Sequence, residues 1–564
     1  MGRRSGKTRW RAVGALVCAL GVVVSACGDD DGGPDGTTGG NGGGGDGGVV
    51  TVGADGFPQI LNTYLPEGAT FWTAAMVSPA LARGYRVTPD LEYEPWLFRE
   101  DCTVSSEEPF TVSCTLVDDA TWSDGEPLTA EDFEFTWQTI MDPDSDVWSR
   151  MGYDRITDFR VVSPTELEMV FDGVYAPFRE LWAGSNTAVL PKHVLEGQDF
   201  GTVWNDCICD PETGEPIGSG PFLVESYTPD EEVTLVRNDA YWGEPARLEQ
   251  VVFKPVAPES LANALRTGEV DVIYPLPDPG LVEEIRGLDG VAVEAGLGPV
   301  WEHFDILTTV PGLDDLEVRR AIATAMPRQA IVDTVVAPVN PDAVVLDNLF
   351  FMSGTADYEP HWEIYPHRGD PIAASEILEA AGWFEGPDGV REKDGARLGF
   401  TLGTSAGDPG RELAQQIIVE ALSEIGIELR IENTDDFVDV RVPGLDYETA
   451  IWALGTGPDP GAVSGFWLSS EIPGQEGSGG FNTTAVSIEQ VDELLLAADS
   501  EPDAGERAKL FNQADQLLAE EGVSTIPLYQ QPSVLAFADR LAGLVDNASI
   551  DTFTWNIEAW SIEG

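Results

Sequence analysis

A stretch made almost wholly of Gly, Asp and Thr, Gly28–Gly48, divides this chain of 564 residues. Such a composition cannot bury an apolar core, so we expect this stretch to act as a flexible tether. The folded part therefore begins near Val49 and extends to Gly564. That length exceeds what one hydrophobic core normally holds, and it predicts two or three domains. Hydrophobic residues make up 42% of the chain, which is enough to fill several cores.

The residues ahead of the tether have the pattern of a secretory signal peptide. A basic stretch, residues 1–11, precedes the apolar run Ala12–Val24. This run is too short to cross a bilayer, which takes about 20 apolar residues. We therefore predict that residues 1–26 form a signal peptide and that the rest of the chain is exported.

Cys27 directly follows the small residues Ser25 and Ala26 at the predicted cleavage site. This order resembles the lipobox of bacterial lipoproteins, in which the cysteine thiol is acylated before cleavage. Stable anchoring takes more than one acyl chain, a need that a diacylated cysteine meets. The resemblance implies that Cys27 anchors the protein to the extracytoplasmic side of the cell membrane, with residues 27–48 as its tether. The alternative is an ordinary signal peptide that contains a cysteine.

The net charge of −67 and the isoelectric point near 4.1 exclude nucleic acid as a partner, because the phosphate backbone would be repelled. An acidic surface suits a salty exterior, where screening shortens charge repulsion to a few ångströms. A lineage whose proteins are generally acidic is an equal explanation.

Four cysteines follow Cys27, and an exported protein meets oxidising conditions that favour disulfides. Cys102 and Cys114 flank a turn-rich stretch, so a bridge across a hairpin is our first choice. Cys207 and Cys209 are separated by a single residue, so a disulfide between them would be strained. All three connectivities stay open. Because the chain has no Cys-x-x-Cys motif and its four histidines are scattered, we predict no structural metal and no cofactor.

Helical and strand patterns alternate along the folded part. Thr129 and Asp132 form the pattern of a capping box, and Phe133, Trp137 and Ile140 follow at helical spacing. Other predicted helices are Leu261–Thr267, Val318–Ile331, Ile377–Ala381, Arg411–Ile425, Val491–Ala498 and Ala504–Glu520. Predicted strands include Phe222–Tyr227, Val270–Ile273, Leu398–Leu402 and Ile427–Ile431. This alternation predicts α/β lobes.

Several motifs follow one another in a fixed order. They are Trp122–Phe133, with Trp-Ser-Asp-Gly at its start, Gly218–Phe222, Asn238–Trp242, Leu265–Asp271 and Val318–Ile322. The ordered set resembles that of the family 5 extracytoplasmic solute-binding proteins, the oligopeptide, dipeptide and nickel receptors of bacterial ABC importers. One departure is Met326-Pro327-Arg328, because the family usually has an Asp-Arg pair there.

The resemblance implies an α/β, bilobal periplasmic-binding-protein-like fold of type II, similar to cluster C, with a hinge and an extra inserted domain. Two crossing segments, near 296–304 and 523–530, would form the hinge. The implied domains are residues 49–76 with 217–299 and 524–564 for lobe I, 77–216 for the inserted domain II, and 300–523 for lobe II, also called domain III.

The function that the resemblance implies involves no catalysis. The protein would capture a small solute between its lobes and deliver it to ABC permease and ATPase subunits in the membrane. An oligopeptide is the leading solute class, and a sugar, an opine or a metal chelate is the alternative. Some relatives act as sensors or adhesins, so a role outside transport stays open.

Candidate ligand-binding residues lie in loops or at the hinge that the resemblance implies. They are Trp72, Trp148, Trp301, His303, Trp452, Asp459 and Trp467. For each of them a purely structural role is the alternative. Many peptide receptors of the family place an Asp three residues after the clamping Trp, where it pairs with the ammonium group of the peptide. Gly455 occupies that place here, which leaves Asp459 as a carboxylate that can serve a cationic group from another position.

Two other functions remain as distant alternatives. Gly403–Gly407 fits G-x-S-x-G, the pattern of a nucleophile elbow, and would make Ser405 the nucleophile of a hydrolase. All four histidines precede Ser405, which disagrees with the chain order of such hydrolases. His361 and His367, with Asp357 and Glu359 near them, offer the ligands of a metal receptor.

Overall fold

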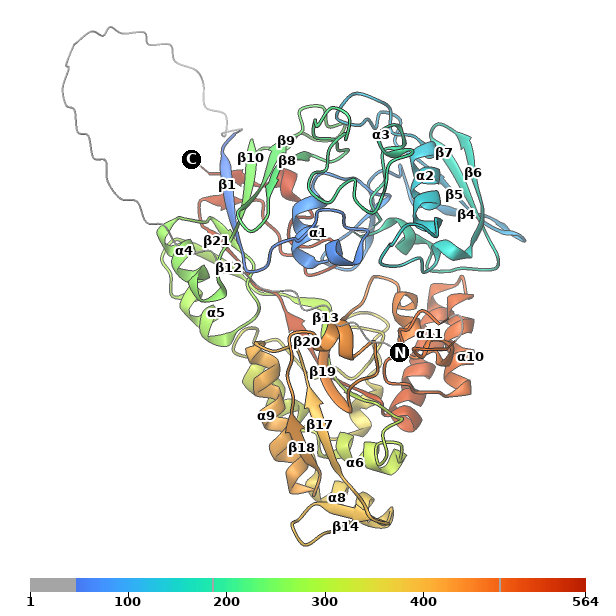
Figure 1. Cartoon of the computed structure of the whole chain (residues 1–564), viewed down its shortest axis with the longest axis vertical. Helices are drawn as coiled ribbons and strands as arrows, with labels where there is room; N and C mark the ends of the chain where they lie inside the picture. Colours follow the sequence, from blue (N-terminus) through green and yellow to red (C-terminus); the bar gives the residue numbers. More distant parts are fainter. Residues whose placement is uncertain (1–46, 185–186, 476–477, 564) are drawn as a thin grey trace, which may run out of the picture. The chain divides into compact units, whose positions relative to one another are not determined.

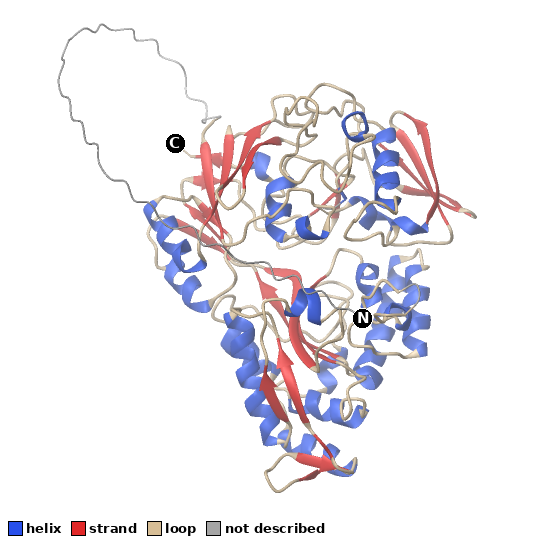
Figure 2. Ribbon diagram, viewed as in Figure 1, coloured by secondary structure: helices blue, strands red, loops and turns tan. Residues whose placement is uncertain are grey.

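The computed structural model describes residues 47–184, 187–475 and 478–563. The predicted signal peptide, Cys27 and nearly all of the tether lie outside these described residues. Three larger sheets and their helices make up most of the described part (Figures 1 and 2).

A seven-stranded sheet combines strands from the beginning, the middle and the end of the chain, in the order β12-β21-β11-β1-β10-β9-β8. Its strands are β1 (Val49–Ala54), β8 (Phe222–Thr228), β9 (Glu232–Arg237), β10 (Gln250–Pro255), β11 (Val272–Ile273), β12 (Val291–Glu294) and β21 (Leu535–Ala538). Strand β1 pairs in parallel with β10 and β11. Helices α4 (Leu261–Thr267) and α5 (Pro279–Arg286) pack on this sheet through Leu265 and Ile285. We call the sheet and these helices, with α1 (Phe71–Val77), the first lobe.

Residues 77–216, which we call the inserted segment, contain a four-stranded antiparallel sheet in the order β4-β5-β7-β6. The strands are β4 (Thr103–Glu107), β5 (Phe110–Thr115), β6 (Ile156–Ser163) and β7 (Glu166–Phe171). Helix α2 (Ala130–Met141) begins with the capping box of Thr129 and Asp132, as predicted. The segment also holds the short pair β2 (Tyr85–Val87) and β3 (Tyr93–Pro95) and helix α3 (Lys192–Leu195).

The structure joins Cys102 to Cys114 and Cys207 to Cys209. The first bridge ties the residue before β4 to β5, across the hairpin that the turn-rich sequence indicated. Of the three connectivities that the sequence left open, this is the one in which each cysteine pairs with its nearest neighbour in sequence.

A five-stranded sheet in the order β18-β17-β19-β13-β20 forms the second lobe. Its strands are β13 (Leu297–Ile306), β17 (Gly399–Gly403), β18 (Glu428–Ile431), β19 (Thr449–Gly455) and β20 (Thr525–Pro532). Its helices are α6 (Leu316–Ala325), α7 (Arg328–Ile331), α8 (Pro371–Ala380), α9 (Pro409–Glu424), α10 (Glu489–Asp499) and α11 (Ala504–Leu517). A small sheet, β14 (Phe384–Glu385), β15 (Arg391–Lys393) and β16 (Ala396–Arg397), lies near α8 (Figure 1), whereas β22 (Leu541–Ala542) and β23 (Ser561–Ile562) pair near the end of the chain.

The prediction of one continuous helix over Val318–Ile331 is wrong. The structure has two helices, α6 and α7, with Met326 and Pro327 between them. Proline lacks the N–H that would continue α6, and it disfavours helical torsions in the residue before it. Met326 accordingly has an extended backbone, with ψ of 116°.

Two strands connect the lobes (Figure 1). Strand β12 of the first lobe leads to β13 of the second across Ala295 and Gly296, and β20 returns to β21 across Ser533 and Val534. Within the second lobe β13 and β20 pair antiparallel, as β12 and β21 do in the first. The crossing segments predicted near 296–304 and 523–530 thus fall largely within β13 and β20, next to these links. Motion of a hinge and the exact domain boundaries stay predictions.

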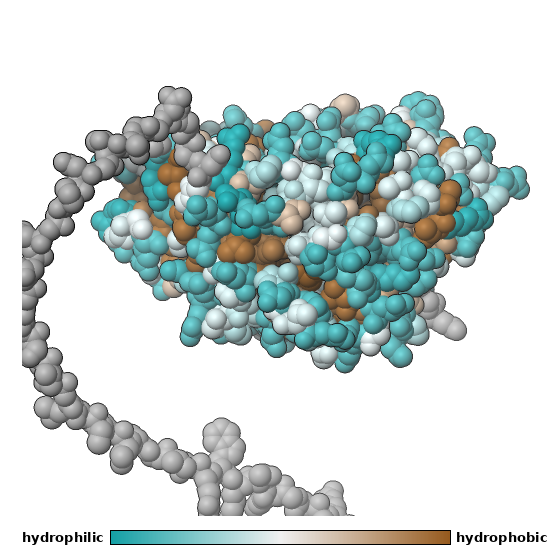
Figure 3. Space-filling view, turned by 90° about the horizontal axis from the view of Figure 1, so that it is seen from above, coloured by the Kyte–Doolittle hydropathy of each residue, from teal (hydrophilic) through white to brown (hydrophobic). Residues whose placement is uncertain are grey.

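No helix among the described residues has the length and apolar character that a membrane crossing requires. On the face shown in Figure 3, hydrophilic residues prevail and hydrophobic ones form small separate patches. That surface agrees with the strongly acidic composition.

The motif Gly218–Phe222 holds the inserted segment against the first lobe by close backbone contact. The N–H groups of Ser219 and Gly220 both donate to the carbonyl oxygen of Ala80 at 2.9 Å. A Cβ atom on Gly220 would lie 2.3 Å from the carbonyl oxygen of Pro79. The second glycine is therefore required by space.

We expect Gly220→Ala to lower the free energy of unfolding by about 1–3 kcal/mol, because the added methyl group forces two backbone segments apart. Urea denaturation of the purified protein measures the change. Gly173→Ala is the matched control, since the nearest atom to its new Cβ would be a flexible arginine nitrogen at 3.7 Å. Equal effects of the two substitutions would contradict this explanation of the motif.

Candidate functional site

A cavity of about 450 Å³ lies where the first lobe meets the two connecting strands. We call it the apolar cavity, because carbon atoms form most of its wall. Residues of the first lobe line one side, and residues of β13, β20 and the link that follows line the other. The main lining residues are Asp55, Phe71, Trp72, Tyr274, Leu276, Val300, Gln531 and Pro532.

Aromatic rings form one wall of this cavity. Thr70 caps α1 by accepting a hydrogen bond from the N–H of Thr73, so Phe71 and Trp72 occupy the first turn of the helix. The ring of Phe71 stacks on Tyr274 at 5.3 Å, and Tyr274 stacks on Phe553 at 4.8 Å. Phe71 is 40% exposed, which leaves a large apolar surface facing solvent. Such a wall can pack against the apolar part of a solute.

A narrower hollow shares Leu276, Pro277, Gln531 and Pro532 with the apolar cavity. Its acidic lining residues each have a structural partner. Glu302 accepts hydrogen bonds from Arg411 at 3.1 Å and from Gln531 at 2.7 Å. Asp278 and Asp408 cap α5 and α9, accepting from the N–H groups of Leu281 and Arg411.

Three candidates from the sequence, Trp301, His303 and Trp452, cluster around Asp305 inside the second lobe. The carboxylate of Asp305 contacts His303 Nδ1 at 3.0 Å and accepts from Trp452 Nε1 at 2.7 Å. Trp301 is fully buried, and its ring lies 5.0 Å from that of His303. None of the three lines the apolar cavity in this structure, and their contact with ligand stays a prediction.

Asp459 is already paired. Its carboxylate lies 2.9 Å from Arg507. The same carboxylate accepts a hydrogen bond from the N–H of Gly461, and Asp459 thereby caps the short turn Pro460–Phe466. Trp467, at the end of that turn, is 1% exposed and packs against Phe350 at 4.8 Å. Arg507 is thus already an ion-pair partner of Asp459 in this structure, and contact of Asp459 and Trp467 with ligand stays a prediction.

Trp148, another candidate, is 58% exposed and lines a separate cavity of about 640 Å³. The walls of that cavity come from the inserted segment and from residues 461–499 of the second lobe. A ligand-binding role for Trp148 stays a prediction.

Two half-buried acidic residues, Glu180 and Asp499, lie where the inserted segment contacts the second lobe. Glu180 accepts from the N–H of Asp459 at 3.1 Å and from the hydroxyl of Tyr93. The carbonyl oxygen of Asp499 accepts from the N–H of Ala176 at 2.9 Å. Burial raises the pKa of Glu180 to about 7, and burial likewise raises the pKa of Asp499 to about 7. These groups are partly protonated near neutral pH, and we call them the acid contact.

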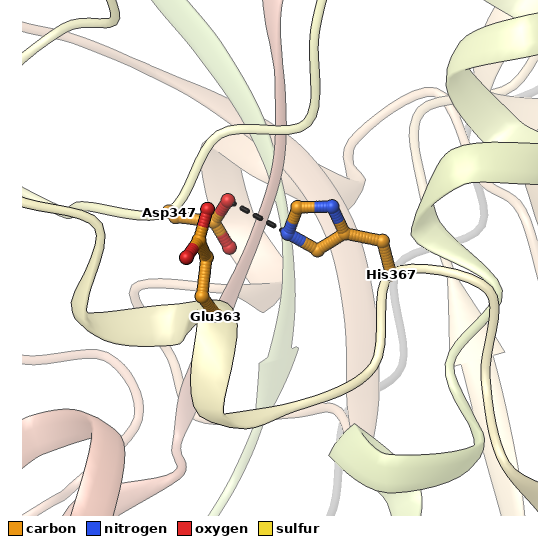
Figure 4. Close-up of side chains that lie close together, drawn as sticks. All are labelled: Asp347, Glu363 and His367. Atoms are coloured by element: carbon orange, nitrogen blue, oxygen red, sulfur yellow. Dashed lines mark ion pairs between the residues drawn. The ribbon is translucent and has the colours of Figure 1, made fainter.

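Of the residues expected for a metal receptor, His367 alone belongs to the group of possible ligands found among the described residues. Asp347, Glu363 and His367 come close enough together to share an ion (Figure 4). His361 instead contacts Glu359 at 3.5 Å. The carboxylate of Asp347 lies 2.9 Å from the buried guanidinium of Arg328 and 2.8 Å from Nε2 of His367, so it already has two partners. Arg328 would oppose a bound cation.

The hydrolase alternative gains no geometric support. Ser405 follows β17, and its backbone forms a bridge with Thr434. Each of the four histidines contacts a carboxylate, and none of the hydrogen bonds found among the described residues joins a histidine to Ser405. A histidine base for Ser405 is therefore not in place in the part of the chain that the structure describes.

Comparison with known proteins identifies the family. The sequence profile of the bacterial extracellular solute-binding proteins, family 5, matches residues 77–474. The chain belongs to this family. Family 5 is a family of solute-binding proteins rather than enzymes, and the resemblance that the ordered motifs indicated is confirmed.

The family 5 relatives cover nearly the whole chain. Protein XP55 of Streptomyces lividans is 27% identical over 88% of this chain and 86% of its own length. Among solved structures, the periplasmic EDTA-binding protein EppA has a TM-score of 0.83 at 22% identity, covering 92% of this chain and 97% of that one. The oligopeptide-binding protein AppA of Bacillus subtilis, in complex with a nonapeptide, has a TM-score of 0.75 at 21% identity, covering 92% and 100%. The predicted bilobal α/β fold is confirmed.

Sequence reasoning missed Asp55, Tyr274, Glu180 and Asp499. Asp55 and Tyr274 each directly follow a strand, but no local motif marks either residue. Glu180 and Asp499 are far apart in sequence, and only the packing of the inserted segment on the second lobe buries them both. A tertiary contact of this kind leaves no periodic signal.

We expect the free energy of unfolding to rise as the pH falls from 8 to 5.5. The folded-state pKa values of Glu180 and Asp499 lie above their unfolded values, so the folded protein binds more protons in this range. The stabilisation is present below the unfolded pKa values and is lost as the pH rises through about 7. It is on the order of 2 kcal/mol for each group.

Denaturation in urea at several pH values measures this slope. Glu180→Gln and Asp499→Asn should flatten it, because an amide does not titrate but keeps an acceptor oxygen. Glu212→Gln, at an exposed position of the inserted segment, is the control. A slope that both variants leave unchanged would rule out the acid contact as its source.

Proposed function

We propose that this chain is the extracytoplasmic substrate-binding component of an ABC importer. It captures a small solute between its two lobes and delivers it to permease and ATPase subunits. Family membership supports the class of function, and the apolar cavity supports the place of binding. The observation that carries the proposal is that this cavity takes its walls from the first lobe and from both connecting strands.

Such a site links binding to closure. A solute that touches both lobes binds the closed state more tightly than the open one, so it shifts the population towards closure. A shift from 1:99 to 99:1 takes about 5.5 kcal/mol of this preference. Closure of two rigid bodies about short connecting segments is an established mode of switching. The membrane subunits need then only distinguish the closed state from the open one.

An oligopeptide is the solute class that we propose first. The AppA structure that this fold resembles holds a nonapeptide, and many of the curated relatives are oligopeptide-binding or glutathione-binding proteins. The similarity to the EDTA-binding protein EppA keeps a chelate as the second candidate. In either case Phe71, Trp72 and Tyr274 contact the apolar part of the solute.

We expect Phe71→Ala to weaken solute binding roughly tenfold, because the variant loses an exposed ring that lines the apolar cavity. Native mass spectrometry identifies the solute that co-purifies with residues 49–564, and titration calorimetry with that solute gives the affinity. Phe384→Ala is the control, since Phe384 is 61% exposed and lies in β14, in the small sheet beside α8. Unchanged affinity in Phe71→Ala would remove the aromatic wall from the site.

We also propose that Cys27 carries the lipid anchor, with residues 27–48 as the tether. In a bacterial host, Cys27→Ser should abolish labelling by an alkyne fatty acid and release the protein from the membrane fraction. Cys18→Ser, within the predicted signal peptide, should leave the labelling unchanged. Labelling that persists in Cys27→Ser would show that the lipid is attached to another residue.

A further inference from the structure

We propose that the apolar cavity takes a solute with a cationic nitrogen beside an apolar group, and that the carboxylate of Asp55 pairs with that nitrogen. The class comprises peptides with a free amino terminus and aromatic or alkyl amines, and it excludes anionic chelates. This inference rests on the proposed function, because it names the solute of the same cavity.

Asp55 is held in place by neutral donors. It follows the end of β1, where it lines the apolar cavity. Trp72 Nε1 donates to one carboxylate oxygen at 3.0 Å, and the N–H of Leu276 donates to the other at 3.4 Å. These donors fix the orientation of the carboxylate without neutralising its charge. A carboxylate held in this way is preorganised for a cation that arrives with the solute.

The other carboxylates around the cavity are committed elsewhere. Glu302 is paired with Arg411, and Asp278 and Asp408 each cap a helix. Arg411 also lies 3.5 Å from Asp408. By contrast, none of the ion pairs found among the described residues includes Asp55. Of the acidic residues that line the apolar cavity and its adjoining hollow, Asp55 alone lacks both a cationic partner and a helix to cap.

The charge around Asp55 favours a cation. The residues that line the apolar cavity include no Lys, Arg or His. Most of its wall is carbon, so a charge there is poorly solvated and has to be compensated by a partner. Burial raises the pKa of Asp55, and the hydrogen bond from Trp72 opposes the rise. A solute ammonium would restore the charged state, whereas a carboxylate-rich solute would be repelled.

Neither Gly455 nor Asp459 of the second lobe offers a carboxylate without a cationic partner. Gly455 has no side chain, and it ends β19 opposite Val300. Asp459 is neutralised by Arg507. Asp55 of the first lobe does offer such a carboxylate, and it lines the cavity.

The experiment compares matched solutes on the purified full-length protein. The panel contains short peptides with a free amino terminus and their N-acetylated forms, tryptamine with N-acetyltryptamine, and EDTA. We expect each bound amine to exceed its acetylated partner in affinity by roughly tenfold or more. Because a cation favours ionised Asp55, the affinity for the amine should fall as the pH falls through the pKa of Asp55 in the free protein.

Asp55→Asn tests the residue. It should bring the two members of each pair to within about twofold of each other, since the charge on Asp55 is the source of the difference. Asp278→Asn is the matched control, because Asn caps a helix as well as Asp does and the discrimination should persist. Melting curves show that both variants fold, and the comparison of solutes on the unaltered protein stands without them.

Equal affinities within the pairs, tight binding of EDTA alone, or discrimination that survives Asp55→Asn would each overturn the assignment of Asp55. In those cases the protein still binds a solute, so the proposed receptor function stands. If no member of the panel binds and nothing co-purifies, the receptor function and the assignment fail together.

Discussion

The pairing of β13 with β20 is the constraint on which the rest of the structure depends. Both strands belong to the sheet of the second lobe, and both continue after two residues into strands of the first. Residues near these links therefore lie close to both sheets. Val300, Gln531 and Pro532 line the apolar cavity from this position, facing residues of the first lobe. A solute that fills the cavity contacts both halves of the protein because the strands that join them form its wall.

Much of the fold could be predicted from the sequence, because its signals are local. The capping box at Thr129 and Asp132 begins α2, and helix α4 has the bounds that its apolar spacing and Gly268 indicated. The helix predicted over Val318–Ile331 contains Pro327, and the proline interrupts the helix although the apolar periodicity continues past it. The resemblance of ordered motifs supplied the family, which periodicity alone does not give.

The site was harder to predict, because its polar groups are defined by what lies across from them. Trp301 and Trp452 have the sequence context of ligand contacts, but the structure buries them against His303 and Asp305. The carboxylate of Asp459 can pair with a cation, but it already forms an ion pair with Arg507, which is distant in sequence. Asp55 carries no motif at all. Whether a carboxylate is free or paired depends on tertiary contacts, and the sequence alone does not show which residues come into contact.

The overall acidity of the protein would not by itself produce the preference for cations that we propose. A net charge of −67 is spread over a surface in salt, where exposed charges act over only about 8–10 Å. It can raise the encounter rate of a cation but selects weakly among bound solutes. Selection needs a carboxylate that is desolvated, oriented and uncompensated, so that the pairing energy is not already spent within the protein. Glu302 and Asp459 are oriented but compensated. Asp55 is oriented by Trp72 and Leu276, lies half-buried beside an apolar wall, and has no cationic partner among the described residues.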